Sequence, residues 1–341
     1  MTDISRALSK LFDGGSLHQA QAFSVFNDVL HGKADETSLT ALLVTLKIKG
    51  ESPDEIAGAA SAMVSNARPF PTPDYAFADI VGTGGDGHNT INISSSAAIV
   101  AAACGVKVAK HGNRSVSSKS GSADLFRECG INLEMSPDTA RQCLDKTGLS
   151  FLFAPVYHQG MKYVMPVRTQ LKTRTLFNIL GPLANPARPT HSMLGVYAPE
   201  LLDIYAKTLM LMGQHKAMIV HGDGLDELAL HGVSTIVELE HGDVRRTTVT
   251  ASDFGLPDYP ISAIEGGEPQ ENKALIMDAL SGKGKEAHRA AIAMNCAALL
   301  VLTGKADSYK DGTEQAMQAM KDQLPLALLE KTAQCSKGAN C

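Results

Sequence analysis

The stretch around which this chain is organised reads Asp79-Ile80-Val81-Gly82-Thr83-Gly84-Gly85-Asp86-Gly87-His88-Asn89-Thr90-Ile91-Asn92-Ile93-Ser94-Ser95-Ser96. An apolar, strand-like run ends in a glycine-rich turn, and a hydroxyl-rich segment then opens an alanine-rich helix. Glycine lets the backbone approach a ligand closely and adopt positive φ, and successive N–H groups at such a turn can bind an anion. The stretch therefore predicts a phosphate-binding loop.

The glycines also fit the G-x-G-x-x-G pattern of dinucleotide-binding proteins, at Gly82, Gly84 and Gly87. That pattern requires the helix to begin at the glycines and an acidic residue about 20 positions later. Here the helical pattern begins near Ser95, and the next strand leads to a lysine and a histidine. A nicotinamide site is therefore disfavoured, which leaves a glycine-rich surface turn without a ligand as the competing interpretation.

A second polar loop follows that next strand and reads Lys110-His111-Gly112-Asn113-Arg114-Ser115-Val116-Ser117-Ser118-Lys119-Ser120-Gly121-Ser122-Ala123-Asp124. It carries three cationic side chains and five serines, with almost nothing to bury. Open α/β sheets bind their ligands at the carboxyl ends of strands. Two anion-binding loops at consecutive strand ends predict a ligand with several phosphate groups, and they weaken the interpretation as a surface turn.

Length and composition limit the class of protein. A chain of 341 residues exceeds the ~250–300 residues at which single cores stop growing, so we expect two structural units. The net charge of −5 argues against a general nucleic-acid binder. The first residues lack the basic-then-apolar pattern of a signal peptide, and no apolar run approaches the ~20 residues needed to span a bilayer. The six cysteines form no C-x-x-C pair, which favours free thiols in a reducing cytoplasm.

Residues 1–66 show helical patterns and no strand signal. Ser16 is expected to cap a helix over Leu17–Leu30, and Glu36–Lys49 carries leucines at helical spacing. Ser52-Pro53-Asp54-Glu55 is a strong helix start, because it combines a capping serine, a proline and two acids. Prolines at positions 69, 71 and 73 then mark a linker.

Strand and helix patterns alternate from Ala78 onward, which predicts an α/β fold with a mostly parallel central sheet flanked by helices. The segment His158–Leu180 is helical in composition and is expected to return to the N-terminal helices. We therefore predict a small all-helical domain of residues 1–70 with roughly 158–190. A larger α/β domain comprises residues 74–157 and 191–331, and residues 332–341 are expected to be a disordered tail.

The two polar loops resemble the phosphoribosyl-pyrophosphate loops of the anthranilate phosphoribosyltransferase family. Two further stretches are similar to signatures of this family, Gly224-Leu225-Asp226-Glu227 and the segment Met165–Pro186. The four motifs stand in the family's order, and the resemblance covers nearly the whole chain. The resemblance implies the second step of tryptophan synthesis from chorismate. In that step anthranilate and phosphoribosyl pyrophosphate give N-(5-phosphoribosyl)anthranilate and pyrophosphate, with Mg²⁺ as cofactor.

The resemblance also implies roles for single residues. Phosphoribosyl pyrophosphate would be bound by Gly82, Gly85, Asp86, Thr90, Asn92, Ile93, Ser94, Ser95, Lys110, His111, Gly112, Asn113, Arg114, Ser115, Val116, Ser117, Ser118 and Ser122. Anthranilate would be contacted by Gly82, Asn113, His158 and Arg168, and Mg²⁺ by Ser94, Asp226 and Glu227. No catalytic residue is assigned, although His111 is a candidate proton acceptor.

The chemistry of these side chains agrees with those roles. Breaking the C1–O bond of the donor leaves negative charge on pyrophosphate, which cations stabilise without a nucleophilic side chain. A guanidinium such as that of Arg168 suits the carboxylate of anthranilate, and an acidic pair such as Asp226-Glu227 suits Mg²⁺. An exposed acidic pair is otherwise usually a solvated turn, and Asp223 is interpreted as a turn residue. One departure from many relatives, Gln159-Gly160 after the histidine, affects loop geometry near the acceptor.

Three other functions fit the sequence less well. Pyrimidine nucleoside phosphorylases share a similar turn but place Lys-His before it, where this chain has Asp79-Ile80-Val81-Gly82. Phosphoribosyltransferases of the commoner type carry two adjacent acids after a strand, whereas Asp79 stands alone. A nucleic-acid-binding relative should lack the acidic pair or the acceptor arginine and should be basic. We therefore expect neither a nucleic-acid nor a membrane partner.

The apolar face of the N-terminal helices is larger than one chain can cover, which favours a homodimer. The resemblance to the family implies a homodimer as well. Association with the glutaminase component of anthranilate synthase is left open by the sequence.

Overall fold

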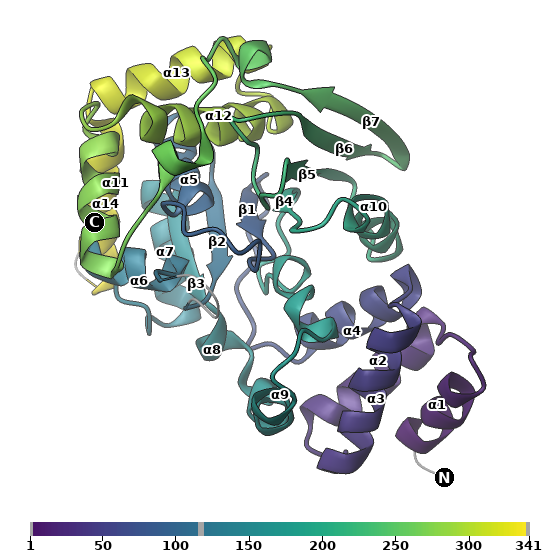
Figure 1. Cartoon of the computed structure of the whole chain (residues 1–341). Helices are drawn as coiled ribbons and strands as arrows, with labels where there is room; N and C mark the ends of the chain where they lie inside the picture. Colours follow the sequence, from purple (N-terminus) through teal and green to yellow (C-terminus); the bar gives the residue numbers. More distant parts are fainter. Residues whose placement is uncertain (1–2, 115–118, 339–341) are drawn as a thin grey trace.

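The N-terminal part of the chain is a helical bundle at one end of the molecule (Figure 1). The computed structural model describes residues 3–114 and 119–338. The bundle comprises α1 (Asp3–Phe12), α2 (Gln19–Leu30), α3 (Glu36–Lys49) and α4 (Pro53–Ser65), with α2 packed on α4 and α1 on α3. The start and cap predicted for α4 are confirmed, but Ser16 does not cap α2, because His18 is the residue before its first turn.

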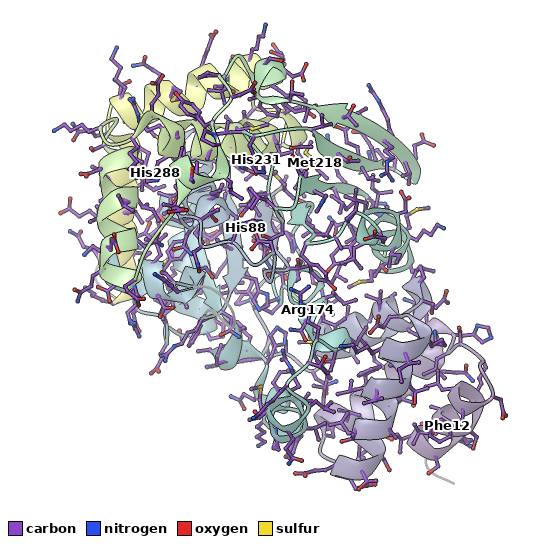
Figure 2. The ribbon with its side chains drawn as sticks, viewed as in Figure 1. Phe12, His88, Arg174, Met218, His231 and His288 are labelled. Atoms are coloured by element: carbon purple, nitrogen blue, oxygen red, sulfur yellow. The ribbon has the colours of Figure 1, made fainter. Side chains whose placement is uncertain are left out.

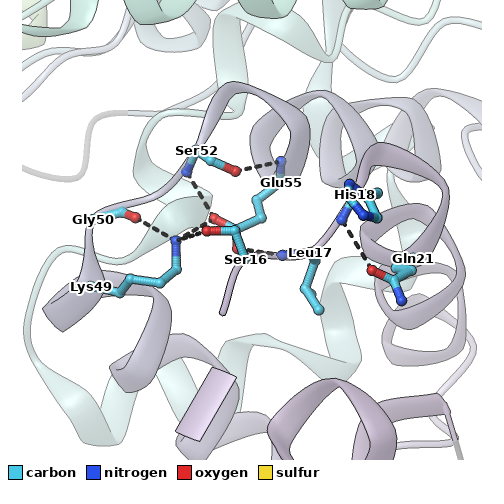
Figure 3. A network of polar contacts seen from close by, with 8 residues as sticks. All are labelled: Ser16, Leu17, His18, Gln21, Lys49, Gly50, Ser52 and Glu55. Carbon is cyan, nitrogen blue, oxygen red and sulfur yellow. Dashed lines mark hydrogen bonds and ion pairs between the residues drawn. The ribbon is translucent and has the colours of Figure 1, made fainter. Parts of the chain in front are cut away.

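A buried carboxylate holds three parts of this bundle together (Figure 3). Glu55, in the first turn of α4, is fully buried and accepts hydrogen bonds from the backbone N–H of Leu17 at 3.0 Å and of Ser52 at 2.8 Å. Its other contact is an ion pair of 2.9 Å with Lys49, the last residue of α3. One side chain thus fixes the α1–α2 linker, the end of α3 and the start of α4.

Replacing this carboxylate should destabilise the bundle. Glu55→Ala leaves two backbone N–H groups without their partner and a partly buried ammonium without its carboxylate, so we expect a loss of about 2–4 kcal/mol in the free energy of unfolding. Urea denaturation followed by circular dichroism measures this loss. Asp54→Ala is the matched control, since Asp54 makes one long bond of 3.3 Å and should cost under about 1 kcal/mol. Equal midpoints for the two variants would contradict the role of Glu55.

Within the described residues, seven strands form one sheet in the order β3-β2-β1-β4-β5-β6-β7. The strands are β1 (Ala78–Gly82), β2 (Val108–Gly112), β3 (Leu149–Phe153), β4 (His191–Gly195), β5 (Lys216–Gly222), β6 (Ser234–Glu240) and β7 (Asp243–Val249). The first five are parallel, and β6 and β7 join them as an antiparallel hairpin. The predicted mostly parallel sheet is confirmed.

Helices cover both faces of the sheet (Figure 1). One face packs on helices that share a large core, namely α5 (Ile93–Ala103), α6 (Ser122–Glu128), α7 (Pro137–Thr147), α11 (Pro269–Leu280), α12 (Glu286–Leu302), α13 (Tyr309–Lys321) and α14 (Leu324–Ser336). On the other face, Leu194, Ile219 and Val237 share a second core with α10 (Leu201–Leu211) and the N-terminal bundle. On β4 and β5, residues next to each other enter different cores, as the pleat requires: Met193 and Met218 lie in the first core, and Leu194 and Ile219 in the second.

The segment 158–190 does return to the N-terminal bundle, since Val164, Val167 and Leu176 lie in the core that contains α2 and α3. It is not one long helix. After α8 (Ala154–Tyr157), it consists of short pieces: η1 (Gln159–Tyr163), α9 (Met165–Leu171), η2 (Leu176–Asn178) and η3 (Gly181–Leu183). Lys172 ends α9 in the left-handed region with φ 46°, and Pro182 is the second residue of η3, so the backbone itself interrupts the helix.

The prediction of a disordered tail over residues 332–341 is wrong for its first half. Helix α14 continues to Ser336 and buries Thr332, Cys335 and Ser336 against α5 and α7. The helix begins after Gln323, whose left-handed backbone turns the chain, and its start has no capping side chain of the kind that marks α4. Residues 339–341 lie outside the described part. No helix in that part is long and apolar enough to cross a membrane.

Candidate functional site

The two predicted loops and the acidic pair meet where the strand order reverses. From β1 the chain proceeds to β2 and β3 on one side, whereas β4 and β5 lie on the other, with Gly82 paired to Gly195. The glycine loop leaves the carboxyl end of β1, and Asp226 follows β5 at the same edge of the sheet. This switch point is where open α/β sheets bind ligands.

The acidic pair holds the glycine loop and the start of α5 together. Asp226 Oδ2 accepts a hydrogen bond of 2.6 Å from the backbone N–H of Gly84. Glu227 Oε1 accepts one of 3.0 Å from the N–H of Ser94, in the first turn of α5. A carboxylate at this end of a helix also interacts favourably with the helix dipole. The Ser94 hydroxyl also hydrogen-bonds to the Glu227 carboxylate, so the serine oxygen and this acid lie next to each other. The sequence predicted these three residues, and the structure brings them together.

The charges at this point are strongly desolvated. Burial is the main cause that raises the pKa of Asp226 and of Glu227, and like charge adds to it, from Asp86 on Asp226 and from Asp226 on Glu227. The Lys110 ammonium lies among these acids but donates to the carbonyl of Ile80, and burial lowers its pKa. Two carboxylates in this setting are costly unless a cation joins them.

The raised pKa values predict how stability depends on pH. A carboxyl group whose folded pKa lies above its unfolded pKa loses stabilising free energy as pH rises toward neutral and beyond. His111 and His158 act in the opposite direction, because their folded pKa values are lowered. Their contribution to stability grows as pH rises to ~6.5 and is constant above that pH. Between pH ~6.5 and the folded pKa values, about 7 for Asp226 and about 8 for Glu227, the melting temperature of metal-free protein should fall by about 2–4 °C per pH unit. Asp226→Asn with Glu227→Gln should flatten this fall in scanning fluorimetry with chelator, and equal slopes would contradict the assignment.

Two glycines are required here by the close approach of Asp226. A Cβ at Gly82 would lie 2.1 Å from Asp226 Oδ2, and one at Gly195 would lie 1.7 Å from the Asp226 carbonyl oxygen. Gly82 was predicted as a ligand-binding residue. Gly195 was not, since a lone glycine at a strand end gives no signal in the sequence.

The second loop begins within β2, because Lys110, His111 and Gly112 belong to that strand. Both carboxylate oxygens of buried Asp79 lie 3.4 Å from the His111 backbone nitrogen, and Asn185 donates to Asp79 at 2.8 Å. Burial raises the pKa of Asp79 to about 6, against the opposing charge of Lys110. Sequence reasoning gave Asp79 and Asn185 no role, because their pairing joins segments 106 positions apart.

The end of this loop is folded back on itself. The Ser122 hydroxyl donates to the Asn113 carbonyl at 3.1 Å, and the Asn113 side chain accepts from the Arg114 N–H at 2.8 Å. The predicted phosphate contacts Ser115, Val116, Ser117 and Ser118 lie outside the described residues.

The remaining predicted donor-binding residues lie along the first loop. Gly85 has φ +80°, and Asp86 accepts from the N–H of His88 at 3.0 Å. Thr90 forms an isolated β-bridge to Glu265, while Asn92, Ile93 and Ser95 form the start of α5.

His111 and His158 are brought together as an edge-to-face pair with ring centroids 5.1 Å apart. Burial, followed by the charge of His158, lowers the pKa of His111 well below its usual value, and burial lowers that of His158 to about 4. His158 Nε2 contacts the Ala184 carbonyl at 2.9 Å, whereas His111 Nε2 is buried without a partner among the described residues. Both rings are therefore neutral at physiological pH.

Arg168 lies in α9 with its guanidinium 5.9 Å from the centroid of the Phe177 ring. The Arg168 guanidinium makes no hydrogen bond or ion pair with another described residue, and burial lowers its pKa. A partly buried guanidinium without a carboxylate is suited to receive one from a ligand.

Arg174 contacts the glycine loop, which the sequence did not predict. Figure 2 shows it between the sheet and the N-terminal helices. Its guanidinium lies 4.2 Å from the centroid of the Tyr197 ring and donates to the carbonyl of Gly85. The segment that carries Arg168 is thus joined directly to the glycine loop.

Family models match most of the chain. Residues 5–67 match the helical bundle domain of the glycosyl transferase family, and residues 74–323 match the a/b domain of that family. The anthranilate phosphoribosyltransferase of Aeromonas salmonicida (strain A449) is 56% identical over 313 residues, covering 92% of this chain and 93% of that protein.

Solved structures agree in fold. Anthranilate phosphoribosyltransferase from Thermus thermophilus is similar with a TM-score of 0.92 and 39% identity, over 99% of this chain and 100% of that one. The enzyme from Saccharomyces cerevisiae, in complex with PRPP and Mg, is similar with a TM-score of 0.90 and 29% identity, over 98% of both chains. The yeast enzyme in complex with 4-fluoroanthranilate gives a TM-score of 0.88 and 28% identity, again over 98% of both chains.

Proposed function

This chain belongs to the anthranilate phosphoribosyltransferases of the glycosyl transferase family, and from that premise we propose how its residues divide the reaction between donor and acceptor. It transfers the phosphoribosyl group of phosphoribosyl pyrophosphate to the amine of anthranilate, in tryptophan biosynthesis. The observation that carries the assignment of roles is the meeting of the glycine loop, Ser94 and the acidic pair at the sheet's switch point.

The donor is held by the two loops. Backbone N–H groups of the glycine loop and the hydroxyls at the start of α5 bind pyrophosphate and ribose, and the loop after β2 binds the 5′-phosphate. Asp226 and Glu227 fit Mg²⁺ because they are desolvated oxygen donors at the ligand-binding edge of the sheet, and the Ser94 hydroxyl, hydrogen-bonded to Glu227, places a third oxygen beside them. When bound, the ion neutralises charge on the departing pyrophosphate.

The acceptor is oriented by Arg168, whose guanidinium pairs with the carboxylate of anthranilate. Gly82, Asn113 and His158 complete its surroundings. The amine forms the bond to C1 as the C1–O bond of pyrophosphate breaks, and the amine then loses one proton. His111 is neutral, and its Nε2 has no described partner, so it is the candidate acceptor of that proton.

The finer organisation is part of the same proposal. We expect a homodimer, because Phe12, Ile48 and Met165 expose large apolar side chains on the helical unit, with exposed fractions of 63%, 82% and 47%. We also expect the protein to be cytoplasmic. The division into a helical unit of residues 1–70 and 158–190 and an α/β unit stays a prediction. Association with the glutaminase component of anthranilate synthase stays open.

The experiment follows anthranilate fluorescence in the presence of phosphoribosyl pyrophosphate, with Mg²⁺ or with chelator. A Mg²⁺-dependent loss of fluorescence with stoichiometric release of pyrophosphate is the expected result. A flat trace from folded protein would contradict the proposed acceptor, and phosphate with pyrimidine nucleosides would be assayed next.

A further inference from the structure

The glycine loop is held from the far end of the chain. Residues 89–91 pair with residues 264–266 through the Thr90–Glu265 bridge, flanked by backbone hydrogen bonds of 2.8 and 3.0 Å. Residues 264–266 connect η5 (Ile261–Ile264) to the start of α11. The second part of the first loop is therefore one strand of a short pairing that α11 anchors.

Asn272, in the first turns of α11, adds a side-chain connection to this pairing. It is 1% exposed, and its Nδ2 donates to Oδ1 of Asn92. Asn92 Nδ2 in turn donates to the backbone carbonyl of Ser120, in the second loop, at 2.9 Å. A Cβ at Gly266 would lie 2.7 Å from Asn272 Oδ1, so the segment packs directly on this amide.

The directions of these bonds follow from the groups involved. A backbone carbonyl can only accept, so Asn92 must present its NH₂ to Ser120 and its oxygen to Asn272. Asn272 must therefore donate, and its own oxygen has no partner among the described residues. Position 272 therefore requires a side chain that donates a hydrogen bond, and a side chain that only accepts one would not replace it.

Asn92 occupies the position before the first turn of α5, where an asparagine usually caps the helix. Its side chain makes no capping bond, because both of its polar atoms connect to other segments. Three segments far apart in the sequence thus meet at one amide: α11, the glycine loop and the loop after β2.

We infer that Asn272 is a positioning residue that fixes the two phosphate-binding loops relative to each other through Asn92. This inference rests on the proposed function only in taking those loops as the site of the pyrophosphate group. Asn272 itself contacts no reacting atom. Without this donor, Asn92 keeps its bonds to Ser120 but is no longer held from α11, so the placement of the two loops is less constrained and the affinity for a ligand that spans them falls.

The test is calorimetric titration of magnesium pyrophosphate into wild-type protein, Asn272→Leu, Asn92→Ala and the double variant. Leucine has the branched shape and the number of non-hydrogen atoms of asparagine, although it is larger, and it removes the donor; the melting temperature checks that the fold is retained. Gln270→Ala, on the exposed face of the same helix, is the matched control. KM values for phosphoribosyl pyrophosphate and for anthranilate are measured alongside.

We expect Kd for magnesium pyrophosphate to rise about tenfold in each single variant, as loss of one buried hydrogen bond implies, with Gln270→Ala unchanged. The double variant should bind about as weakly as the weaker single variant, and the KM for anthranilate should stay within about twofold. A Kd for Asn272→Leu equal to wild type, or losses that multiply in the double variant, would overturn the inference. Wild-type protein that binds pyrophosphate but leaves anthranilate unchanged would overturn the proposed function alone. Wild-type protein that does not bind pyrophosphate would overturn both.

Discussion

Asp226→Asn combined with Glu227→Gln should lower kcat/KM by on the order of a thousandfold and abolish the response to Mg²⁺, a loss of about 4 kcal/mol in transition-state stabilisation. The amides keep the shape of the site and remain able to accept the bonds from Gly84 and Ser94. They remove the two charges that hold the cation. The fold should therefore survive, and the melting temperature without metal should rise above that of wild type at pH ~8, because buried repulsion is removed.

The control for this variant lies on the same loop. Asp223 is exposed and has φ 41°, a backbone conformation that asparagine adopts readily, so Asp223→Asn should change activity by less than about twofold. Steady-state assays over a Mg²⁺ titration compare the two variants. If the double variant kept the wild-type Mg²⁺ midpoint, the pair would not be the metal site.

Arg168→Ala should raise the KM for anthranilate by roughly 10- to 100-fold, because a charged hydrogen bond to a carboxylate contributes about 1.5–3 kcal/mol. The KM for phosphoribosyl pyrophosphate should not change, since the guanidinium has no described contact with either phosphate loop. Arg168→Lys should recover only part of the loss, because an ammonium keeps the charge without the bidentate fork.

Lys162→Ala is the matched control for Arg168, as its ammonium lies 4.9 Å from the centroid of the neighbouring Tyr163 ring in the same segment. It should leave both KM values within about twofold. Initial rates with each substrate varied separately give the two KM values for both variants. A change confined to the KM for phosphoribosyl pyrophosphate in Arg168→Ala would place that arginine on the donor side.

Local signals in the sequence were sufficient for most elements. Ser52 and Pro53 start α4 as predicted, and the alternation of strands and helices indicated the parallel sheet and both loops. These signals failed where the backbone is irregular, as in the broken segment after His158 and at the turn into α14. The cause is that a left-handed residue such as Lys172 or Gln323 leaves no pattern in its neighbours.

The chemistry of this protein could be predicted from contiguous motifs, because the glycine turns, the acidic pair and the segment with the acceptor arginine are each local in the chain. The contacts that support these motifs became visible only in the folded molecule. The pairing of Asp79 with Asn185, the approach of Gly195 to Asp226 and the bond from Asn272 to Asn92 each join residues far apart in the chain. Such contacts depend on burial and on the order of strands in the sheet, so no local pattern of residues announces them.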